Sequence, residues 1–437
     1  MENQPSLSRR SFVNTAAAAG LSTLAISKSA HAAGSDVIKF GLVGCGGRGT
    51  GAASQIMNSE HPTQLVAMAD AFMDKVEGSK DRLAKQYKDK VKVTADTMFA
   101  GFDAYQKVLE SGIDLIVLAT PPGFRPFHLE AAVKAGKHVF MEKPVCVDGA
   151  GAKKVLDAAA AAKKQNTTIA VGLQRRHEPR YIETIKRLQD GAIGDINYMR
   201  AFWNGGGVWT RPRQPGQTEL EYQMRNWYYF NWLCGDHITE QHIHNLDVIN
   251  WLKDGYPVSA QGMGGREVRG NPANDADAKE HGEIFDHHFV EYEYADGSRL
   301  YSQCRHIRNC MNSVSEHAYG SKGSCDINRY IIDVKGGEPW RSNAKGVSGH
   351  QQEQLDLIEA LSKGEIYNEA EYGAMSSMTS VLGRYATYSG KVVTMDQALK
   401  SKSTMPDNIS WSTDAPVKPD ENGFYAAAAI PGNYRIS

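Results

Sequence analysis

The sequence predicts an α/β protein with an N-terminal Rossmann domain over residues 36–172 and an α+β domain over residues 173–400 that contains a large, mostly antiparallel sheet. In the first part, short and almost continuously apolar strands alternate with helical segments, which is typical of a parallel sheet covered on both faces. In the second part, two alternating strands flank Asp296-Gly297, a strong hairpin signal. A length of 437 residues also suits two domains better than one.

Each element of the first domain follows from its pattern of apolar residues. Strands are predicted at 37–43, 64–70, 114–119, 138–141 and 168–171. Helices are predicted from the end of the second strand to residue 84, at 126–135 and at 153–163, the last being rich in alanine.

The second domain mixes helices, strands and loops. Helices are predicted at 181–189, where Asp190-Gly191 ends the helix, and at 239–252, 353–361 and 375–387. Strands are predicted at 196–203, 289–294 and 299–304. Polar residues at 266–280 predict a loop, and residues 401–437 form a tail with few periodic features.

The first 32 residues carry the features of an export signal. Ser8-Arg9-Arg10-Ser11-Phe12-Val13 resembles the twin-arginine motif, an alanine-rich run follows at 15–26, and Ala30-His31-Ala32 fits an A-x-A cleavage pattern. We therefore expect a signal peptide over residues 1–32 and a periplasmic protein delivered by the twin-arginine export machinery. The alternative is an N-terminal segment that is disordered or forms a frayed amphipathic helix.

Composition limits the classes of partner. Hydrophobic residues make up 41% of the chain, charged residues 23%, and the formal net charge is −1. A charge this close to zero argues against nucleic acid or anionic membranes as partners. No apolar run after residue 33 is long enough to predict a membrane span. The six cysteines lack a repeated spacing and are expected to be free, buried thiols, with a bond from Cys304 to Cys310 or Cys325 left open.

A glycine-rich turn follows the first predicted strand. The GxGxxG pattern at a strand-to-helix turn is typical of dinucleotide binding, and its candidate cofactor residues are Gly44, Gly46, Gly47, Arg48 and Gly49. Asp70 ends the second strand, where a carboxylate accepts hydrogen bonds from the adenosine ribose hydroxyls and repels a 2′-phosphate. The sequence therefore favours NAD over NADP, with a cap on the next turn as the alternative role of Asp70.

Two further segments carry a family signature. Ala119-Thr120-Pro121-Pro122 with His128, and Ala135-Gly136-Lys137-His138-Val139-Phe140-Met141-Glu142-Lys143-Pro144, resemble motifs of the glucose–fructose oxidoreductase/inositol dehydrogenase/MocA (Gfo/Idh/MocA) family. The resemblance extends over about residues 38–399. It implies that Lys143 lies beside the nicotinamide and that Thr120, Pro121, His128 and Glu142 contact the cofactor. A lysine at the carboxyl edge of a parallel sheet can also stabilise a developing alkoxide.

Residues 235–252 resemble the family segment in which an acid and, four residues later, a histidine face the substrate. Matching Asp247 and Trp251 places Glu240 at the acidic position and His244 at the histidine position. On one helix face, His244 would take the proton of a substrate hydroxyl, and Glu240 would orient His244 or bind a neighbouring hydroxyl. Glu240 replaces the family's aspartate and His242 a small residue, which predicts an altered substrate pocket.

The same segment raises a metal site as an alternative, because His237, His242, His244 and Glu240 are potential ligands. His242 and His244 would point about 160° apart on an ideal helix, so we predict no metal site. A buried structural role for His237 or His242 is the other alternative.

Three residues are predicted to bind substrate: Arg176, Trp232 and His242. For Arg176, an interdomain ion pair is an equal alternative. The middle region is also rich in aromatic side chains, which stack on sugar rings but more often form a core or a subunit interface. These are Trp203, Trp209, Trp227, Tyr228, Tyr229 and Trp232.

Together with the resemblance, these residues predict an exported oxidoreductase that transfers hydride between a nicotinamide cofactor and a secondary alcohol of a sugar, polyol or glycoside. Because free NAD(H) is normally absent outside the cytoplasm, we expect the cofactor to stay tightly bound and to be recycled in place. Two alternatives stay open: an NAD-dependent glycosidase or epimerase that oxidises its substrate transiently, and a cofactor-binding protein without catalysis. We expect a homo-oligomer, either a dimer or a tetramer.

Overall fold

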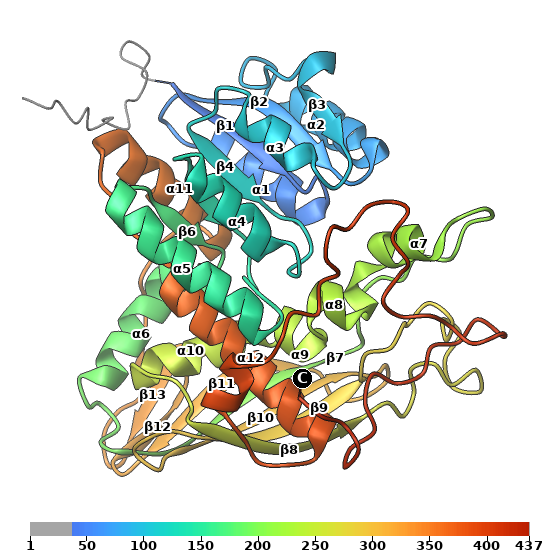
Figure 1. Cartoon of the computed structure of the whole chain (residues 1–437). Helices are drawn as coiled ribbons and strands as arrows, with labels where there is room; N and C mark the ends of the chain where they lie inside the picture. Colours follow the sequence, from blue (N-terminus) through green and yellow to red (C-terminus); the bar gives the residue numbers. More distant parts are fainter. Residues whose placement is uncertain (1–36, 437) are drawn as a thin grey trace, which may run out of the picture.

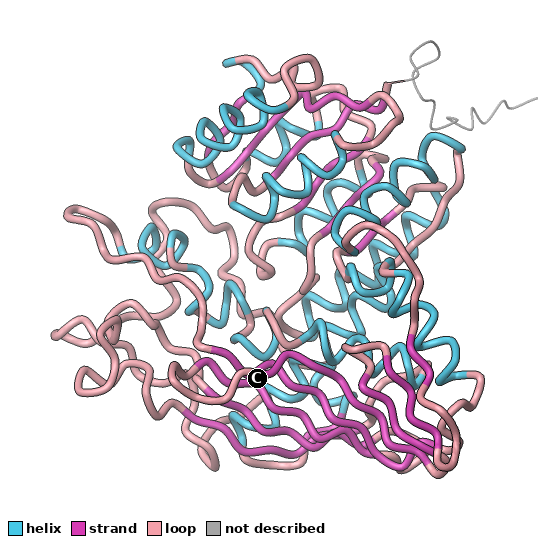
Figure 2. Tube along the Cα trace, turned by 180° about the vertical axis from the view of Figure 1, so that it is seen from behind, coloured by secondary structure: helices cyan, strands magenta, loops and turns pink. Residues whose placement is uncertain are grey.

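The computed structural model describes residues 37–436, so the predicted signal peptide over residues 1–32 lies outside the described residues. Within that range the chain forms two parts, one above the other in Figure 1, and each is built on one β-sheet. Figure 2 shows them from behind, with helices between the two sheets and long loops gathered at one side of the second.

The first part is built on a six-stranded sheet in the order β3-β2-β1-β4-β5-β6, and its neighbours all pair in parallel. The order reverses between β1 and β4, which places a ligand crevice at the carboxyl ends of these strands. The predicted Rossmann fold is confirmed. Its elements are β1 (Ile38–Val43), α1 (Gly47–Met57), β2 (Thr63–Asp70), α2 (Met73–Gln86), η1 (Ala95–Thr97), β3 (Met98–Ala100), α3 (Ala104–Leu109), β4 (Leu115–Leu118), α4 (Arg125–Lys134), β5 (His138–Met141), α5 (Gly149–Gln165) and β6 (Ile169–Val171).

The second part is built on a nine-stranded sheet in the order β14-β13-β12-β11-β7-β10-β9-β8-β15. Its neighbours pair antiparallel except β7 and β10, which run parallel. The strands are β7 (Ile196–Gly205), β8 (Ser259–Gly265), β9 (His287–Glu293), β10 (Arg299–His306), β11 (Ser313–Gly320), β12 (Gly323–Asp326), β13 (Ile331–Val334), β14 (Trp340–Arg341) and β15 (Val393–Thr394). The predicted mostly antiparallel sheet is confirmed.

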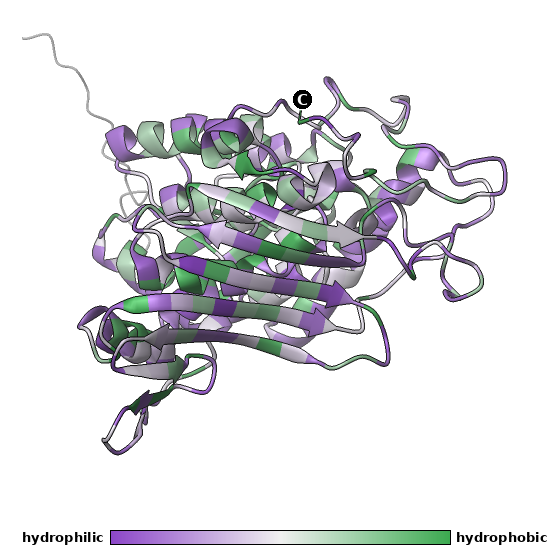
Figure 3. Cartoon of the chain, turned by 90° about the horizontal axis from the view of Figure 1, so that it is seen from below, coloured by the Kyte–Doolittle hydropathy of each residue, from purple (hydrophilic) through white to green (hydrophobic). Residues whose placement is uncertain are grey.

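One face of this sheet is covered by helices. Buried and half-buried residues alternate along β10, as expected for a strand with one covered face. Figure 3 shows the sheet from below, with hydrophilic and hydrophobic residues interspersed along its strands. The predicted hairpin is confirmed, because β9 and β10 pair antiparallel across Asp296-Gly297 and Gly297 has φ +83°.

The remaining helices lie between the sheets or beside the second one. They are η2 (Gln174–His177), α6 (Pro179–Gln189), α7 (Glu219–Arg225), η3 (Trp227–Tyr229), α8 (Asn231–Cys234), α9 (His237–Glu240), α10 (Ile243–Lys253), α11 (Gly349–Lys363), α12 (Ala370–Ser389) and α13 (Met395–Leu399). Helix α12 packs against α5, α10, β8 and β9, and α11 packs against α1. Across residues 37–436, no helix combines the length and the apolar character needed to cross a membrane.

One predicted element is wrong. The single helix expected over 239–252 is two helices, of which α9 ends at Glu240 and α10 begins at Ile243. The amide of His242 hydrogen-bonds to the carbonyl of His237, five residues back, which is a π-type turn. The His242 side chain is fully buried, and its Nε2 lies 2.7 Å from Ser302 Oγ on β10. This contact with the sheet stabilises the break.

The C-terminal tail is packed although residues 401–436 form neither helix nor strand. Tyr425 is buried, and its hydroxyl donates a hydrogen bond to Glu219. The ring centroid of Trp411 lies 5.3 Å from that of Phe72 and 4.6 Å from that of Phe102. The tail therefore covers the loops that follow β2 and β3.

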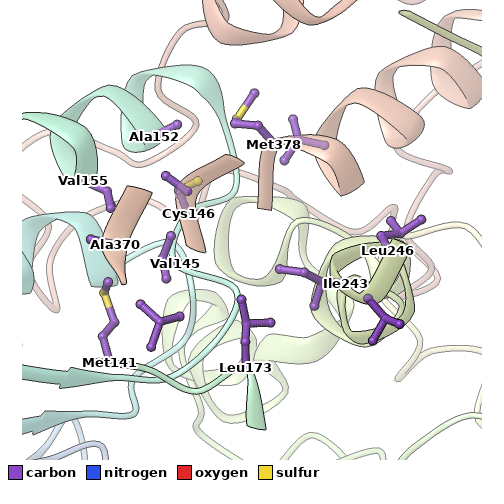
Figure 4. Packing of buried hydrophobic residues seen from close by; sticks show 14 of the residues in the cluster. Met141, Val145, Cys146, Ala152, Val155, Leu173, Ile243, Leu246, Ala370 and Met378 are labelled. Carbon is purple, nitrogen blue, oxygen red and sulfur yellow. The ribbon is translucent and has the colours of Figure 1, made fainter. Parts of the chain in front are cut away.

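A shared hydrophobic core joins the two parts. Figure 4 shows side chains from β5, α5, α10, α12 and the segments after β5 and β6 packed together: Met141, Val145, Cys146, Ala152, Val155, Leu173, Ile243, Leu246, Ala370 and Met378. Fully burying a Val, Leu, Ile or Met side chain stabilises a protein by about 1.5–3 kcal/mol. The core thus fixes the segment that follows β5 against α10. All six cysteines are free thiols, and Cys310 is the exposed one.

Candidate active site

The glycine-rich turn between β1 and α1 brings backbone segments too close together for side chains. Gly44 has φ +97°, and a Cβ there would lie 2.5 Å from the carbonyl carbon of Ala119. A Cβ on Gly49 would lie 1.9 Å from the carbonyl oxygen of Gly44. Gly46 faces open space and caps α1 without a side-chain hydrogen bond. The first N–H groups of α1 are therefore available to an anion such as a pyrophosphate.

A cavity of about 490 Å³ opens next to this turn, at the carboxyl ends of β1, β2 and β4. From the first part, the predicted cofactor residues that line it are Gly44, Gly46, Gly47, Arg48, Gly49, Asp70, Thr120, Pro121 and His128. The second part contributes residues that include Trp209, Arg211, Trp227, Tyr228, Glu240 and Gln241. Glu142 and Lys143 do not line the cavity, but they contact Arg48 and Glu240, which do.

Asp70 lies at the end of β2 with its carboxylate at the edge of the cavity. Its Oδ2 accepts a hydrogen bond from the amide of Cys45 at 2.7 Å, and its Oδ1 accepts one from Phe72 at 3.2 Å. Burial raises the pKa of Asp70, and these two hydrogen bonds oppose the rise. The contact with Cys45 ties the carboxylate to the glycine-rich turn, and the contact with Phe72 fulfils the predicted alternative role of a cap.

Two pairs, each of one buried and one half-buried side chain, support the cavity walls. His128 Nδ1 lies 3.2 Å from Thr120 Oγ1, and burial together with the charge of Arg125 lowers the pKa of His128 to about 3. Arg48 Nε lies 2.8 Å from Glu142 Oε1, which connects α1 to the segment after β5. Thr120, His128 and Glu142 of the family signature thus stabilise the cavity wall around the glycine-rich turn.

Lys143 and Glu240 form a buried ion pair between the two parts of the molecule. Lys143 Nζ donates to the carbonyl oxygen of Glu240 at 2.6 Å and to its Oε1 at 3.2 Å. Glu240 Oε2 is buried without a hydrogen-bond partner. Burial raises the pKa of Glu240, and the charge of Lys143 opposes that rise. The sequence predicted both residues separately and did not predict that they pair.

His244 lies in the first turn of α10, beyond the break. Its ring stacks on Trp203 with 5.9 Å between centroids, and its Nδ1 has no hydrogen-bond partner. Burial and then the charge of Lys143 hold the pKa of His244 well below its ordinary value, so the imidazole is neutral near pH 7. Because the helix is interrupted, Glu240 and His244 do not share a continuous helical face. The described hydrogen bonds of the Glu240 carboxylate go to Lys143.

The three predicted substrate-binding residues do not line the cavity. Arg176 forms a two-pronged ion pair with Asp247, and both residues belong to the second part, so this is an ion pair within that part and not the predicted interdomain pair. Trp232 is buried, and its Nε1 donates to Gln223 Oε1 at 2.9 Å. His242 contacts Ser302, as described above. Each of the three side chains therefore has a polar partner inside the protein, which the sequence pattern could not reveal.

Apart from Glu240, the cavity wall in the second part consists of residues that the sequence did not assign to the site. Trp209, Trp227 and Tyr228 line it with Arg211. The aromatic-rich composition of this region indicated a possible sugar-binding surface, but it did not distinguish the residues that line the cavity from those in the core. Tyr229, for example, is fully buried.

Comparison with known proteins agrees with this arrangement. A family model described as "Oxidoreductase family, NAD-binding Rossmann fold" matches residues 38–172, and one described as "GFO/IDH/MocA C-terminal domain" matches residues 181–326. The chain belongs to the Gfo/Idh/MocA family. The expected resemblance is confirmed over these residues, which include the whole first sheet and strands β7 to β12 of the second sheet of this family member.

Curated relatives include several inositol dehydrogenases. Inositol 2-dehydrogenase of Rhizobium meliloti is 28% identical over 222 residues, which are 51% of this chain and 57% of that protein. Inositol 2-dehydrogenase 4 of Saccharopolyspora erythraea is 31% identical over 216 residues, which are 49% of this chain and 54% of that protein. The Gfo/Idh/MocA chain thus spans little more than half the length of these relatives.

Solved structures share the fold over a greater length. The aldose-aldose oxidoreductase of Caulobacter crescentus complexed with glycerol has a TM-score of 0.62 at 18% identity, covering 82% of this chain and 99% of the other. A levoglucosan dehydrogenase in complex with NADH and levoglucosan has a TM-score of 0.63 at 16% identity, with the same coverage. At these identities the likeness shows the fold alone.

Proposed function

We propose that this Gfo/Idh/MocA protein is an NAD-dependent oxidoreductase that transfers hydride between the cofactor and a secondary alcohol of a sugar, polyol or glycoside. The observation that carries the proposal is the buried Lys143–Glu240 pair beside a crevice lined by a glycine-rich turn. The names of the curated relatives, inositol 2-dehydrogenases, support the same substrate class.

The crevice suits NAD in two respects. The amino end of α1 offers N–H groups to the pyrophosphate, and Asp70 offers a carboxylate to the adenosine ribose. When bound, NAD accepts the hydride. The carboxylate of Asp70 opposes the extra phosphate of NADP, so NAD is the preferred cofactor in this proposal.

The chain's own residues handle the alcohol and its proton. Two of the three N–H groups of Lys143 are used by Glu240, and the third is available to the alcohol oxygen, whose developing charge it stabilises. His244 is neutral and takes the hydroxyl proton. The unpartnered Oε2 of Glu240 accepts a hydrogen bond from a neighbouring hydroxyl. Trp209, Trp227 and Tyr228 offer flat apolar surface to a sugar ring.

The Asp70→Ala variant is expected to bind NAD about 10- to 100-fold more weakly, because a hydrogen bond to a charged group contributes about 1.5–3 kcal/mol. NADP binding should weaken less. Titration calorimetry with both cofactors measures the change, and Asp74→Ala, which removes an exposed carboxylate in the next helix, is the matched control. Tighter binding of NADP than NAD by the unaltered protein would contradict this role of Asp70.

We also propose that the chain is exported to the periplasm by the twin-arginine route with its cofactor already bound. The N-terminal motif at residues 8–13 and the cleavage pattern ending at Ala32 support export. A bound and locally recycled cofactor then follows from the shortage of free NAD(H) outside the cytoplasm. Met263 and Phe289, exposed on strands of the second sheet, support the proposal of a homodimer or homotetramer.

Cofactor retention can be measured on protein recovered from the periplasmic fraction. Denaturation should release about one NAD(H) per chain, as expected for a single Rossmann site, and the mature N-terminus should be Ala33. A panel of polyols, sugars and glycosides should then change the absorbance of the bound cofactor. Recovery of cofactor-free protein that binds added NAD weakly would contradict retention. Hydrolysed or epimerised product without net oxidation would contradict net oxidation of the alcohol and favour the glycosidase or epimerase alternative.

A further inference from the structure

A second cluster of reactive side chains lies buried between α9 and the second sheet. It consists of His237 at the start of α9, His288 on β9 and Cys304 on β10, with exposed fractions of 0%, 3% and 1%. His288 and Cys304 are directly opposite each other in the β9–β10 pairing, so their side chains share one face of the sheet. One donor atom from each of the three residues lies within 4.8 Å of the other two.

The histidine rings are held from outside the cluster. His237 Nδ1 lies 2.7 Å from Asp236 Oδ1, and His288 Nδ1 lies 2.9 Å from Thr387 Oγ1. The Nε2 atoms of both rings are buried without a hydrogen-bond partner. That of His288 lies 3.3 Å from Asp236 Oδ1, within ion-pair distance. Imidazoles that bind metals show this arrangement, with one ring nitrogen fixed by an oxygen and the other left for the ion.

We propose that His237, His288 and Cys304 bind a transition-metal ion. Two imidazoles and one thiolate are a donor set for zinc or copper, because both ions accept nitrogen and soft sulfur ligands. Bonds of about 2.0 Å to nitrogen and about 2.3 Å to sulfur place tetrahedral ligand atoms about 3.3–3.6 Å apart, so donor atoms that lie within 4.8 Å of one another need to move closer by at most about 1.5 Å. Binding displaces the thiol proton of Cys304, which leaves to solvent as the thiolate coordinates.

Asp236 acts outside the donor set. Its Oδ2 accepts hydrogen bonds from the Phe285 amide and the Tyr388 hydroxyl, and its Oδ1 orients His237. The backbone of Asp236 has φ +71°, a conformation that residues other than glycine rarely adopt. An ion bound by His237 would therefore hold this turn against the sheet.

The metal site would help to position the proposed active site, because the two share helix α9. His237 begins the short helix α9, and Glu240, the partner of Lys143, ends it. An ion that ties His237 to β9 and β10 fixes the helix that presents Glu240. This positioning role rests on the proposed function, whereas metal binding itself does not.

Metal content provides the direct test. Full-length protein purified without a metal-affinity tag should contain about one zinc or copper ion per chain by plasma mass spectrometry, which also tells the two ions apart. Cys304→Ser and His288→Gln should each lower the metal content at least about tenfold. The matched controls are Cys325→Ser, which replaces a buried thiol on β12, and His242→Gln, which replaces a buried histidine in hydrogen-bond contact with Ser302. Both variants should keep the ion.

A titration covers the case in which the variants do not fold. The unaltered protein is stripped with a chelator and titrated with Co²⁺, and a thiolate-to-cobalt charge-transfer band should appear and saturate near one equivalent. Protein that stays metal-free after incubation with Zn²⁺ and with Cu²⁺ and shows no cobalt band would overturn the proposal. It would indicate a histidine cluster held by hydrogen bonds around Asp236 instead. Retention of the ion at the unaltered level by Cys304→Ser would also overturn it.

Discussion

The Lys143→Met variant is expected to turn over its substrate about 100- to 1,000-fold more slowly, because it removes the cation that stabilises charge on the reacting oxygen. Cofactor content should stay the same, since Lys143 does not line the cavity beside the glycine-rich turn. Steady-state kinetics on a substrate from the panel measure kcat. Lys137→Met is the matched control, because Lys137 belongs to the same sequence motif but its Nζ donates to the carbonyl of Ile113.

A second substitution separates catalysis from stability at this position. Removing Lys143 leaves Glu240 buried without its partner, which destabilises the fold. The Lys143→Met/Glu240→Gln protein should recover much of the lost thermal stability, because neither side chain then carries a charge, but it should stay inactive. Recovery of turnover together with stability would show that Lys143 acts only by holding Glu240.

The His244→Asn variant is expected to lower kcat by about 100-fold or more, because positioned proton transfer contributes about 100- to 10,000-fold. Thermal stability and bound cofactor should change little, since the described ring contact of His244 is the stack on Trp203. Combining His244→Asn with Lys143→Met should be little worse than the poorer single variant, as groups that act as one unit are not additive.

The control for this prediction is another buried histidine, His242, which contacts Ser302 on β10. His242→Asn should affect stability more than turnover. Near-normal turnover by His244→Asn on a confirmed substrate would mean that the match through Asp247 and Trp251 is out of register, and His237 or His242 would then be the candidate base.

Local motifs predicted which residues of the first part line the crevice. A glycine-rich turn after an apolar strand has one common geometry, so Gly44, Gly49 and Asp70 could be placed at the crevice from spacing alone. The contribution of the second part depends on contacts between segments far apart in the chain. Lys143 and Glu240 pair across the two parts of the molecule, and no periodicity within either segment encodes that contact.

The same reason explains the errors. The interruption between α9 and α10 is stabilised by the contact of His242 with Ser302. The sequence over 239–252 has the pattern of one continuous helix, but this contact lies outside that segment and could not be predicted from it. His237 was weighed as a ligand with its sequence neighbours, whereas its spatial partners, His288 and Cys304, lie on strands much later in the chain. Ligand sets assembled by sheet pairing leave no spacing signature of the kind a single helix leaves.

The packed tail bears on how fast the crevice can exchange its contents. Phe72 and Phe102, which Trp411 covers, both line the cavity near Asp70. Thr404, at the other end of this stretch, is anchored to Asp148 at the start of α5. A nucleotide that leaves past Asp70 can do so only after Trp411 separates from Phe72 and Phe102. Its residence time would therefore depend on how fast the C-terminal tail detaches. Slow release can then arise without unusually strong contacts to the cofactor itself.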